Sequence, residues 1–489
     1  MKQNLIIITP DQLRADYLGC YGNTSVKTPH IDSLAKDGVV LENCYCSSPL
    51  CGPSRISFAT STYVGEHGHR QYWSEISPDV PNLVTSLKNS GYRTGMFGKN
   101  HLFTYDRLGE LWDELDEICL GNYDGHPDYK HSFSAFTMEP EHPFNISGRL
   151  TDELIEFMTS SDRPFFGWVN YQDPHPAFTC PPPYDTMFDP ENIKLPQSFD
   201  GANADKRPVR NQVWEKHSEM EICSESDMRK AIAHYMGQIA YLDDCVGRII
   251  QALNENGLAE STVILFFSDH GELLGDYHIT HKNPTFYDCL TKIPVIMRIP
   301  GLNYSGERFT GLTEQVDLTP TLLELLDVPI PPTMIGRSMA KGLKNKNYKG
   351  KETVLVEAGG GAPTPKEPIP GFTLVAPHAP TSFGPGAMLR HGSMKLSIYS
   401  DDICELYDIE KDPGELVNLF ENAEYAQVRA QLTEKLLMRL LSVKTRDVGI
   451  NWDYPPYPVD VRFAPLERAY SSGQSIDERE KDRVKGRPY

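Results

Sequence analysis

The 489-residue sequence contains no apolar segment long enough to cross a membrane. A membrane-spanning helix needs about 20 consecutive apolar residues, whereas the longest apolar runs, such as Leu5–Ile8 and Val263–Phe267, have the length of single strands. We therefore expect a soluble protein with no membrane partner. The first run begins near residue 4, which leaves no room for a secretory leader. This indicates a cytoplasmic protein, or a periplasmic or secreted one if a leader has been removed.

Positive charge is also scarce. The chain has 47 Lys and Arg against 67 Asp and Glu, a net charge of −20. Such an excess of negative charge opposes a wide contact with nucleic acid or anionic lipid. We therefore expect no nucleic-acid partner, and an anionic substrate would need a local basic pocket.

Cysteine is too rare for a disulfide-stabilised scaffold. Ten cysteines in 489 residues do not form the dense framework of small secreted domains, and most of them are expected to be small buried hydrophobes. Hydrophobic residues make up 39% and charged residues 23%, which is ordinary globular composition and excludes a disordered or fibrous chain. At about 150 residues per domain, the length allows two or three domains.

Strand-like apolar runs alternate with helical patterns along most of the chain. This alternation predicts an α/β fold with a large mixed, mostly parallel sheet sandwiched by helices. We assign residues 1–375 to this larger domain, which ends in a Gly- and Pro-rich stretch over 359–386 that is either a linker or a lid. Residues 376–445 predict a smaller α+β domain with an antiparallel sheet and a helix. The aromatic tail over 446–489 is expected to wrap this subunit or to contact a neighbour in a homo-oligomer.

Chemically active side chains follow four predicted strands. In open α/β sheets, ligands bind beyond the carboxyl ends of the strands, so residues at these ends are expected to meet. The residues that follow the four strands are Asp11 and Gln12, Lys99 and His101, Asp173 and His175, and Asp269 and His270.

The segment from residue 50 to 55, with the sequence LCGPSR, places a cysteine just before a helix. Pro53 suits a first helical turn, and the helix is expected to run through residues 56–63. Anionic chemistry is favoured at a helix N-terminus, and Arg55 lies one turn from Cys51. From spacing alone, Cys51 is equally a structural thiol or a reactive one.

The CxPSR pattern resembles the signature of the formylglycine-dependent sulfatases of the alkaline phosphatase superfamily. The resemblance extends along nearly the whole chain through motifs in the same order. They are GKNH at 98–101, DPHP at 173–176, SDHGELLGDYH at 268–278, HK at 281–282, VDLTPTL at 316–322 and LYDIEKDPGE at 406–415. The resemblance implies an alkaline phosphatase-like fold and a sulfuric ester hydrolase. It also implies that a formylglycine-generating enzyme oxidises Cys51 to an aldehyde.

A divalent metal site is predicted from two strand ends and the signature cysteine. Oxygen and nitrogen donors of this kind suit a hard or borderline cation, although any one of them could equally be a helix cap or a turn residue. The resemblance implies calcium, while Gln12 and His270 depart from the all-oxygen version and leave magnesium or manganese open. The predicted ligands are Asp11, Gln12, Cys51, Asp269 and His270.

Three cations are predicted to surround the sulfate group, namely Arg55, Lys99 and Lys282. Such an array stabilises the charge on a sulfuryl group during transfer, although each lysine alone could be a solvated surface charge. Lys282, His175 and His69 are the predicted substrate-binding residues. The resemblance gives weaker support to substrate contacts from His67, Tyr72 and Trp73.

The resemblance also implies a mechanism. The hydrated aldehyde at residue 51 would attack sulfur in line, activated by the metal. His175, with help from Lys282, would protonate the departing alcohol. His101 would then take a proton from the second hydroxyl, which releases sulfate and restores the aldehyde.

Two other functions remain open. A phosphonate monoester or phosphodiester hydrolase of the same superfamily shares the cysteine motif and the metal set, but Lys99 and His101 argue against it. A non-catalytic sulfatase-fold binding protein would lack site residues, and none is missing. The expected substrate is a sulfated small molecule or carbohydrate, and the sequence does not identify the alcohol.

Overall fold

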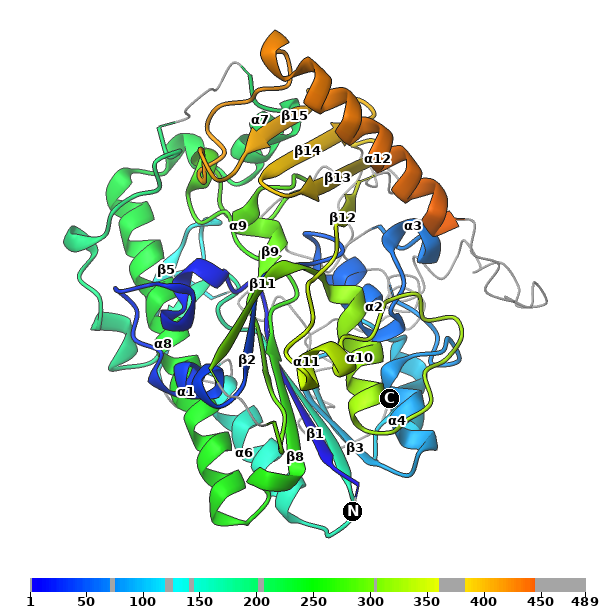
Figure 1. Ribbon diagram of the computed structural model, residues 1–489. Coiled ribbons are helices and arrows are strands. Elements are labelled where there is room, and N and C mark those ends of the chain that lie inside the picture. Colours follow the sequence, from blue (N-terminus) through cyan, green and yellow to red (C-terminus); the bar gives the residue numbers. More distant parts are fainter. Residues whose placement is uncertain are drawn as a thin grey trace.

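The computed structural model describes residues 2–70, 75–118, 126–139, 145–200, 206–302, 306–359 and 383–444. A large sheet occupies the lower part of the molecule and a smaller sheet lies above it (Figure 1). Among the described helices, none combines the length and apolar composition that a membrane-spanning helix needs.

The large sheet has nine strands in the order β11-β2-β10-β8-β1-β6-β3-β4, with β9 paired to β2. All strands on this path run in one direction except β10, which is antiparallel to β8 and β2. The predicted mixed, mostly parallel sheet is therefore confirmed. Its strands are β1 (Asn4–Pro10), β2 (Val39–Tyr45), β3 (Arg93–Lys99), β4 (Glu114–Ile118), β6 (Phe165–Tyr171), β8 (Thr262–Phe267), β9 (Lys292–Ile293), β10 (Val295–Arg298) and β11 (Glu307–Glu314).

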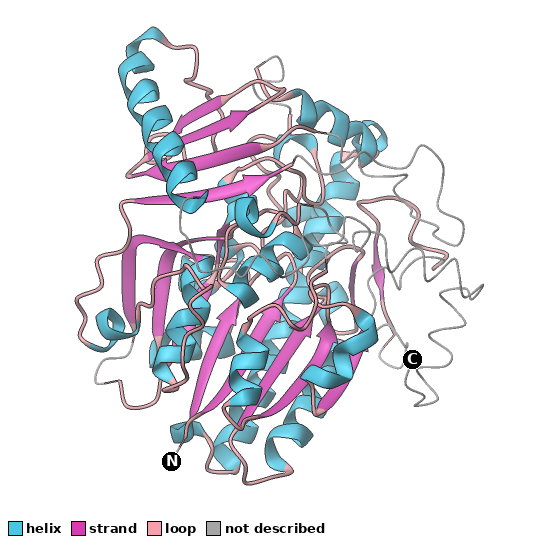
Figure 2. Ribbon diagram, turned by 90° about the vertical axis from the view of Figure 1, so that its right-hand side faces the viewer, coloured by secondary structure: helices cyan, strands magenta, loops and turns pink. Residues whose placement is uncertain are grey.

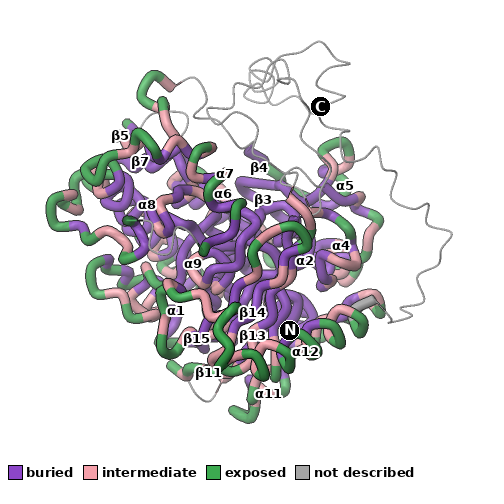
Figure 3. Tube along the Cα trace, turned by 90° about the horizontal axis from the view of Figure 1, so that it is seen from above, coloured by how far each residue is buried: buried purple, intermediate pink, exposed green. Residues whose placement is uncertain are grey.

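Helices cover both faces of this sheet (Figure 2). Side chains alternate along a strand, so Ile6 and Ile8 of β1 pack in one core, and Leu5 and Ile7 pack in the other. The first face is covered by α1 (Pro29–Asp37), α6 (Ser147–Thr159) and α8 (Glu225–Glu255); the second by α2 (Cys51–Thr60), α4 (Leu83–Asn89), α5 (Leu108–Leu111), α10 (Leu318–Leu325) and α11 (Ala340–Lys344). Seen from above, the buried strands form the centre and the exposed turns lie at the periphery (Figure 3).

The small sheet is antiparallel and has the order β12-β13-β14-β15. It packs against a single long helix through Leu355, Leu389, Leu396, Leu432 and Leu436. The elements are β12 (Thr353–Ala358), β13 (Gly386–His391), β14 (Met394–Tyr399), β15 (Glu405–Asp408) and α12 (Ala426–Lys444).

The small sheet begins earlier in the chain than the predicted second domain. The predicted boundary at residues 375–376 lies outside the described residues, whereas β12 precedes it and pairs with β13. β12, which belongs to the small sheet, therefore lies within the range of residues predicted for the larger domain. The predicted tail over 446–489 and its homo-oligomer contact also lie outside the described residues.

The remaining short helices and strands lie outside the two larger sheets. A two-stranded parallel sheet joins β5 and β7. These elements are β5 (Ala135–Thr137), β7 (Phe178–Cys180), α3 (Val64–His67), α7 (Val209–His217) and α9 (Asp288–Thr291).

Candidate active site

Four adjacent strands of the large sheet deliver the predicted residues to one edge. The strands β8, β1, β6 and β3 are parallel neighbours, so their carboxyl ends lie side by side. Asp11 follows β1, Lys99 ends β3, and Asp269 follows β8. All three are almost fully buried, which explains why residues so distant in sequence form one site.

Cys51 is the first residue of α2 and is buried at the same edge. Its Sγ atom lies 3.1 Å from Nε2 of His270 and 3.7 Å from Oδ1 of Asp11. Burial and Asp11 raise the pKa of this thiol, but Lys282, Lys99 and His270 outweigh them and bring it below the ordinary value. The cysteine is therefore in an environment that favours an anionic or nucleophilic group.

Four of the five predicted metal ligands gather in one buried cluster. One ligand atom from each of Asp11, Cys51, Asp269 and His270 lies within 4.8 Å of the others. Nδ1 of His270 donates to the Gly271 carbonyl at 2.8 Å, so Nε2 is the ring nitrogen that faces the carboxylates. Burial lowers the pKa of His270, but Asp269 and Cys51 outweigh it and raise the value; a bound cation would take the place of the proton on Nε2. Two carboxylates and an imidazole nitrogen fit a divalent cation at this position.

Gln12, the fifth predicted ligand, faces two other polar groups. Its Nε2 donates to Glu272, and its Oε1 accepts a hydrogen bond of 2.5 Å from Nζ of Lys282. Its backbone N–H donates to Oδ1 of Asp269 at 3.1 Å. The residue therefore borders the cluster, with its side-chain oxygen directed to Lys282.

Arg55 links the two carboxylates of the cluster. Its Nε donates to Oδ2 of Asp269 at 2.9 Å, and its Nη2 lies 3.6 Å from Oδ2 of Asp11. Its Nη1 donates to Oδ1 of Asn170 on β6 at 2.8 Å. The guanidinium thus fixes the cluster and adds positive charge to it.

Lys99 and His101 lie beside the cluster at the end of β3. Nζ of Lys99 donates to Oδ2 of Asp11. Burial opposes ionisation of Asp11, yet Lys99, His175 and Arg55 hold its pKa well below the ordinary value. Burial, Lys99 and Arg55 lower the pKa of His101 far below its ordinary value, so its imidazole is neutral at neutral pH.

Lys282 and His175 form a second pair at the site. Nζ of Lys282 donates to Nε2 of His175 at 2.8 Å, while Nδ1 of His175 donates to the Pro176 carbonyl at 2.5 Å. Burial and Lys282 lower the pKa of His175 well below its ordinary value. Burial lowers the pKa of Lys282, but Cys51, Asp11 and Asp269 outweigh it and raise the value. The shared proton therefore resides on the lysine.

A family model described as Sulfatase matches residues 3–328. The chain belongs to the sulfatase family. It is therefore a sulfatase of the alkaline phosphatase superfamily, and the predicted family and enzyme class are confirmed.

Individual relatives agree with this membership. The chain is 26% identical to "Uncharacterized sulfatase YidJ" of Escherichia coli over 96% of this chain and 97% of that protein. It is 26% identical to an arylsulfatase of Clostridium perfringens over 90% of this chain and 95% of that one. A solved structure, the phosphonate monoester hydrolase SpPMH of Silicibacter pomeroyi, superposes with a TM-score of 0.75 at 26% identity, covering 90% and 96% of the two chains.

The predicted substrate contacts over residues 67–73 are placed only in part. His67 and His69 of this sulfatase are largely buried. His67 contacts Oγ of Ser57 on α2 through Nε2 at 2.9 Å, and its Nδ1 accepts from the His69 backbone at 3.1 Å. These contacts hold the loop that carries the two histidines in place. They do not themselves show a contact with substrate. Tyr72 and Trp73 lie outside the described residues.

Sequence reasoning missed three polar residues that support the sulfatase site. Asn170 binds Arg55 from within a buried strand, and Glu272 binds Gln12. Gln315 accepts from the Ser47 backbone and contacts Oγ of Ser54, each at 3.0 Å. A polar residue inside an apolar strand was the available signal for Asn170, because such a group needs a buried partner.

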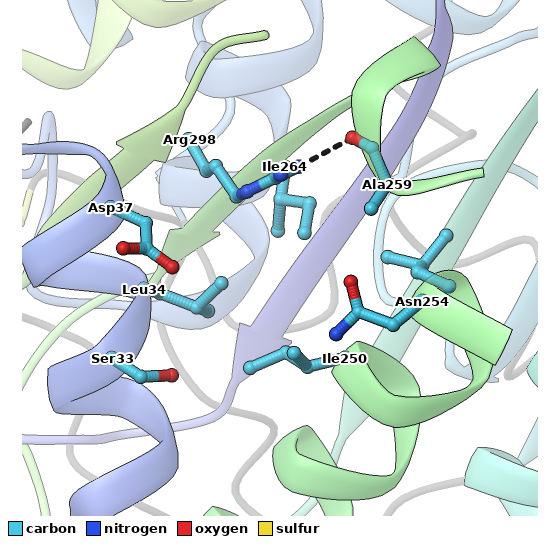
Figure 4. Close-up of a pocket in the computed structure, with 9 residues that line it drawn as sticks. Ser33, Leu34, Asp37, Ile250, Asn254, Ala259, Ile264 and Arg298 are labelled. Atoms are coloured by element: carbon cyan, nitrogen blue, oxygen red, sulfur yellow. Dashed lines mark hydrogen bonds between the residues drawn. The ribbon is translucent and has the colours of Figure 1, made fainter. Parts of the chain in front are cut away.

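A separate small cavity of about 50 Å³ lies away from the sulfatase site (Figure 4). It is bordered by Leu34 of α1, Ile250 and Asn254 of α8, and Ile264 of β8. Arg298 closes one side by donating to the Ala259 carbonyl at 2.6 Å. None of the residues that border this cavity belongs to the predicted site.

Proposed function

We propose that this sulfatase hydrolyses a sulfate monoester to an alcohol and inorganic sulfate through a formylglycine derived from Cys51 and a divalent cation. The observation that carries the proposal is the position of Cys51. Its sulfur lies within one buried cluster with Asp11, Asp269 and His270, and three cationic side chains surround that cluster. A merely structural thiol would not need this environment.

The donor set supports a divalent cation held by Asp11, Asp269, His270 and residue 51. Calcium is the first expectation, and the imidazole ligand keeps magnesium and manganese as alternatives. Together the cation and the hydrated aldehyde supply an activated oxygen nucleophile at neutral pH. The side-chain oxygen of Gln12 could join the ligands only by leaving or sharing its bond to Lys282.

The cationic side chains are proposed to have different roles in the reaction. Arg55 orients the two carboxylates, because its Nε is hydrogen-bonded to Asp269, its Nη1 is hydrogen-bonded to Asn170, and its Nη2 lies 3.6 Å from Oδ2 of Asp11. Lys99 and Lys282 each carry a charge at the site that can bind sulfate oxygens. In this arrangement the lysines stabilise the transferring group and Arg55 holds the metal ligands.

The proposal also names a proton donor for the departing alcohol and a proton acceptor for the release of sulfate. Lys282 carries the proton that it shares with Nε2 of His175, so this pair is proposed to protonate the departing alcohol. His101 is neutral and buried beside Lys99, and it is proposed to accept the proton when sulfate leaves. His69 stays a proposed substrate contact.

Maturation of Cys51 is proposed to precede folding. Cys51 and Arg55 are 1% and 2% exposed, so a second enzyme cannot reach them in the folded chain. A formylglycine-generating enzyme would therefore act while the segment from residue 51 to 55 is extended.

The rival activity is hydrolysis of phosphonate monoesters or phosphodiesters. The chain is equally identical, at 26%, to the arylsulfatase and to the phosphonate monoester hydrolase, so identity does not decide between them. The presence of Lys99 and His101 together favours sulfate. A non-catalytic binding role is disfavoured because every predicted metal ligand and cation is present at the site.

The test compares two cysteine variants of protein produced with a formylglycine-generating enzyme. Cys51→Ala should abolish release of sulfate from 4-nitrophenyl sulfate and leave the thermal midpoint nearly unchanged. Cys245→Ala is the control, because Cys245 is equally buried but lies on α8. Sulfate release by Cys51→Ala at the wild-type rate would refute the proposal. Faster cleavage of a phenylphosphonate ester than of any sulfate ester would establish the rival activity instead.

A further inference from the structure

His281 directly precedes Lys282, and the reaction as proposed above gives it no role. Its φ of 67° lies in the left-handed region, which a residue other than glycine occupies only when surrounding contacts impose it. Its backbone carbonyl is one of these contacts and accepts from the Leu273 N–H at 3.0 Å. Because imposed backbone conformations of this kind gather at functional sites, the side chain of His281 is a candidate for a role in the reaction.

The imidazole of His281 lies on the more open side of the site. Its ring stands at 88° to the ring of His175, with 6.3 Å between the two ring centres. The carboxylates and cations around residue 51 are almost fully buried, whereas His175 and His281 are half-buried. A sulfate ester that places its sulfate group among the cations would therefore extend its alcohol part toward these two rings.

A buried serine holds the ring of His281 in place. Nε2 of His281 donates to the Ser132 carbonyl at 3.0 Å. Oγ of Ser132 donates to the Ser218 carbonyl and accepts from Oγ1 of Thr280 at 3.1 Å. The pairing of β5 with β7 brings this segment beside the chain that follows His175. The ring is therefore anchored by chain segments that meet at the site.

The Ser132 carbonyl also decides which nitrogen of His281 carries the hydrogen. A carbonyl oxygen can only accept, so Nε2 carries it, and Nδ1 of the neutral imidazole is then an acceptor. Burial and Lys282 lower the pKa of His281 to about 3, so the ring is neutral at neutral pH. Within the part of the chain that the structure describes, no hydrogen-bond donor reaches Nδ1. This nitrogen is therefore left to accept a hydrogen bond from a ligand.

We propose that His281 is a substrate-binding residue whose Nδ1 accepts a hydrogen bond from a hydroxyl group next to the sulfated oxygen of the alcohol. The inference rests on the proposed sulfate ester hydrolysis and deepens it. A neutral acceptor does not attract a second anionic group, and it cannot bind an ether oxygen, which also only accepts. The preferred substrates are therefore monosulfates of vicinal diols whose second hydroxyl is free, and methylation or sulfation of that hydroxyl should remove the preference.

The experiment compares two substitutions of His281 with a matched control. His281→Gly removes the imidazole and suits the positive φ. His281→Asn also tolerates this φ and keeps an acceptor, because the amide oxygen is two bonds from Cβ, as Nδ1 is. His278→Gly is the control, because His278 is a half-buried histidine of the same loop with a φ of 58°, and its Nδ1 contacts Glu215 at 2.8 Å.

We would measure kcat/KM for 2-hydroxy-4-nitrophenyl sulfate and for its 2-methoxy counterpart, which keeps the oxygen but has no O–H to donate. The ratio of the two values should be about fivefold higher in the wild type than in His281→Gly, which is the effect of one neutral hydrogen bond. His281→Asn and His278→Gly should keep most of the wild-type ratio. The intrinsic reactivity of the two esters and the fraction of active protein both cancel in this comparison.

The corresponding alkyl pair is 2-hydroxyethyl sulfate and 2-methoxyethyl sulfate, for a wild type that cleaves no aryl sulfate. Equal ratios in the wild type and His281→Gly would overturn the inference. Loss of the preference in His281→Asn or in His278→Gly would also overturn it, because the effect would then not belong to Nδ1 of His281. Cleavage of other sulfate esters but of neither pair would overturn it as well. A wild-type protein that cleaves no sulfate ester at all would instead refute the proposed function.

Discussion

Arg55 is a single residue whose shape, and not only its charge, matters to the site. Its planar guanidinium reaches Asp269, Asn170 and Asp11 at the same time. The ammonium of a lysine is a point charge on a flexible chain and cannot reproduce this fork.

Arg55→Lys is therefore expected to lower kcat/KM for sulfate esters by about 100-fold, because the two carboxylates lose their common support. The thermal midpoint should also fall, since buried carboxylates left without partners destabilise the folded state. Steady-state kinetics and thermal unfolding measure the two effects. Arg298→Lys serves as the control, because Arg298 pairs with Glu260 at the edge of the separate cavity. Full activity of Arg55→Lys would show that charge alone suffices.

The sequence predicted the residues of the site better than their contacts. Asp11 and Asp269 were predictable because parallel strands bring their carboxyl ends to one edge. The contacts of Gln12 with Glu272 and Lys282 were not, because they depend on which way each side chain leaves its loop. Asn170 was missed for a related reason, since the partner of a buried polar group is chosen by neighbouring strands.

At the scale of elements, long periodic patterns were predicted more accurately than their ends. Apolar residues recur at helical spacing over residues 228–256, and this segment corresponds to α8, which begins at Glu225 and is capped by Ser224. Thr151 and Asp152 are residue types that favour a helix N-cap, yet both lie inside α6, which already begins at Ser147. The run over 387–398 is two strands, since Gly392 takes a φ of 58° and forms the turn between β13 and β14.

Burial of the first turn of α2 leads to a prediction about maturation. Purified folded protein with a Cys51 thiol should not be modified by a formylglycine-generating enzyme, whereas the same protein unfolded in urea and diluted into the reaction should be. Mass spectrometry of the peptide that contains residue 51 detects the aldehyde, in which oxygen replaces the sulfur. Equal conversion of the folded and unfolded forms would contradict the burial of this turn.

Glu314 joins the end of β11 to α3 and α12. Arg439 of α12 donates to its carboxylate at 2.7 Å, and the Tyr63 hydroxyl donates at 2.6 Å. Burial alone would raise the pKa of Glu314, but Lys351 and Arg439 lower it to about 2. Because the folded-state value lies below the ordinary one, this carboxylate stabilises the fold above about pH 4.5, and the stabilisation is lost as the pH falls toward 2.

Glu314→Gln is accordingly expected to reduce the free energy of unfolding at neutral pH by on the order of 3 kcal/mol. The variant should also lose less stability than the wild type between about pH 5 and pH 3. Urea unfolding at several pH values measures both effects. Glu307→Gln is the control on the same strand, because Glu307 is only half-buried and pairs with Lys346. Parallel stability curves for Glu314→Gln and the wild type would contradict this role.

At the scale of the whole molecule, the proposed cation should couple the active site to global stability. A ligand that binds only the folded state at 100 times its dissociation constant stabilises that state by about 2.7 kcal/mol. Chelation should therefore lower the thermal midpoint and the activity together, and added metal should restore both.

Asp269→Asn should remove the response of the thermal midpoint to metal. Asp243→Asn is the matched control, because Asp243 belongs to the other His and Asp cluster of the described residues, with His30 and Asp244. This control should keep the response even if its own midpoint is lower. A response that follows Asp243 instead would move the metal site away from Cys51.

The fold as a whole was predictable because alternating apolar strands and helices admit few arrangements. The sheet membership of β12 was not, since pairing with β13 joins strands separated by a long stretch of chain. Local periodicity predicts whether a segment is a helix or a strand. Which distant strands pair depends on packing, and a single sequence does not reveal it.

All of the proposed chemistry depends on an oxidised residue 51. Preparations that differ only in the fraction of Cys51 converted to formylglycine, made with increasing amounts of the modifying enzyme, allow the most direct measurement. Turnover of a sulfate ester per chain should rise in proportion to the converted fraction and extrapolate to zero where no chain is converted. Full turnover in preparations whose residue 51 is still a thiol would show that the reaction does not use the aldehyde.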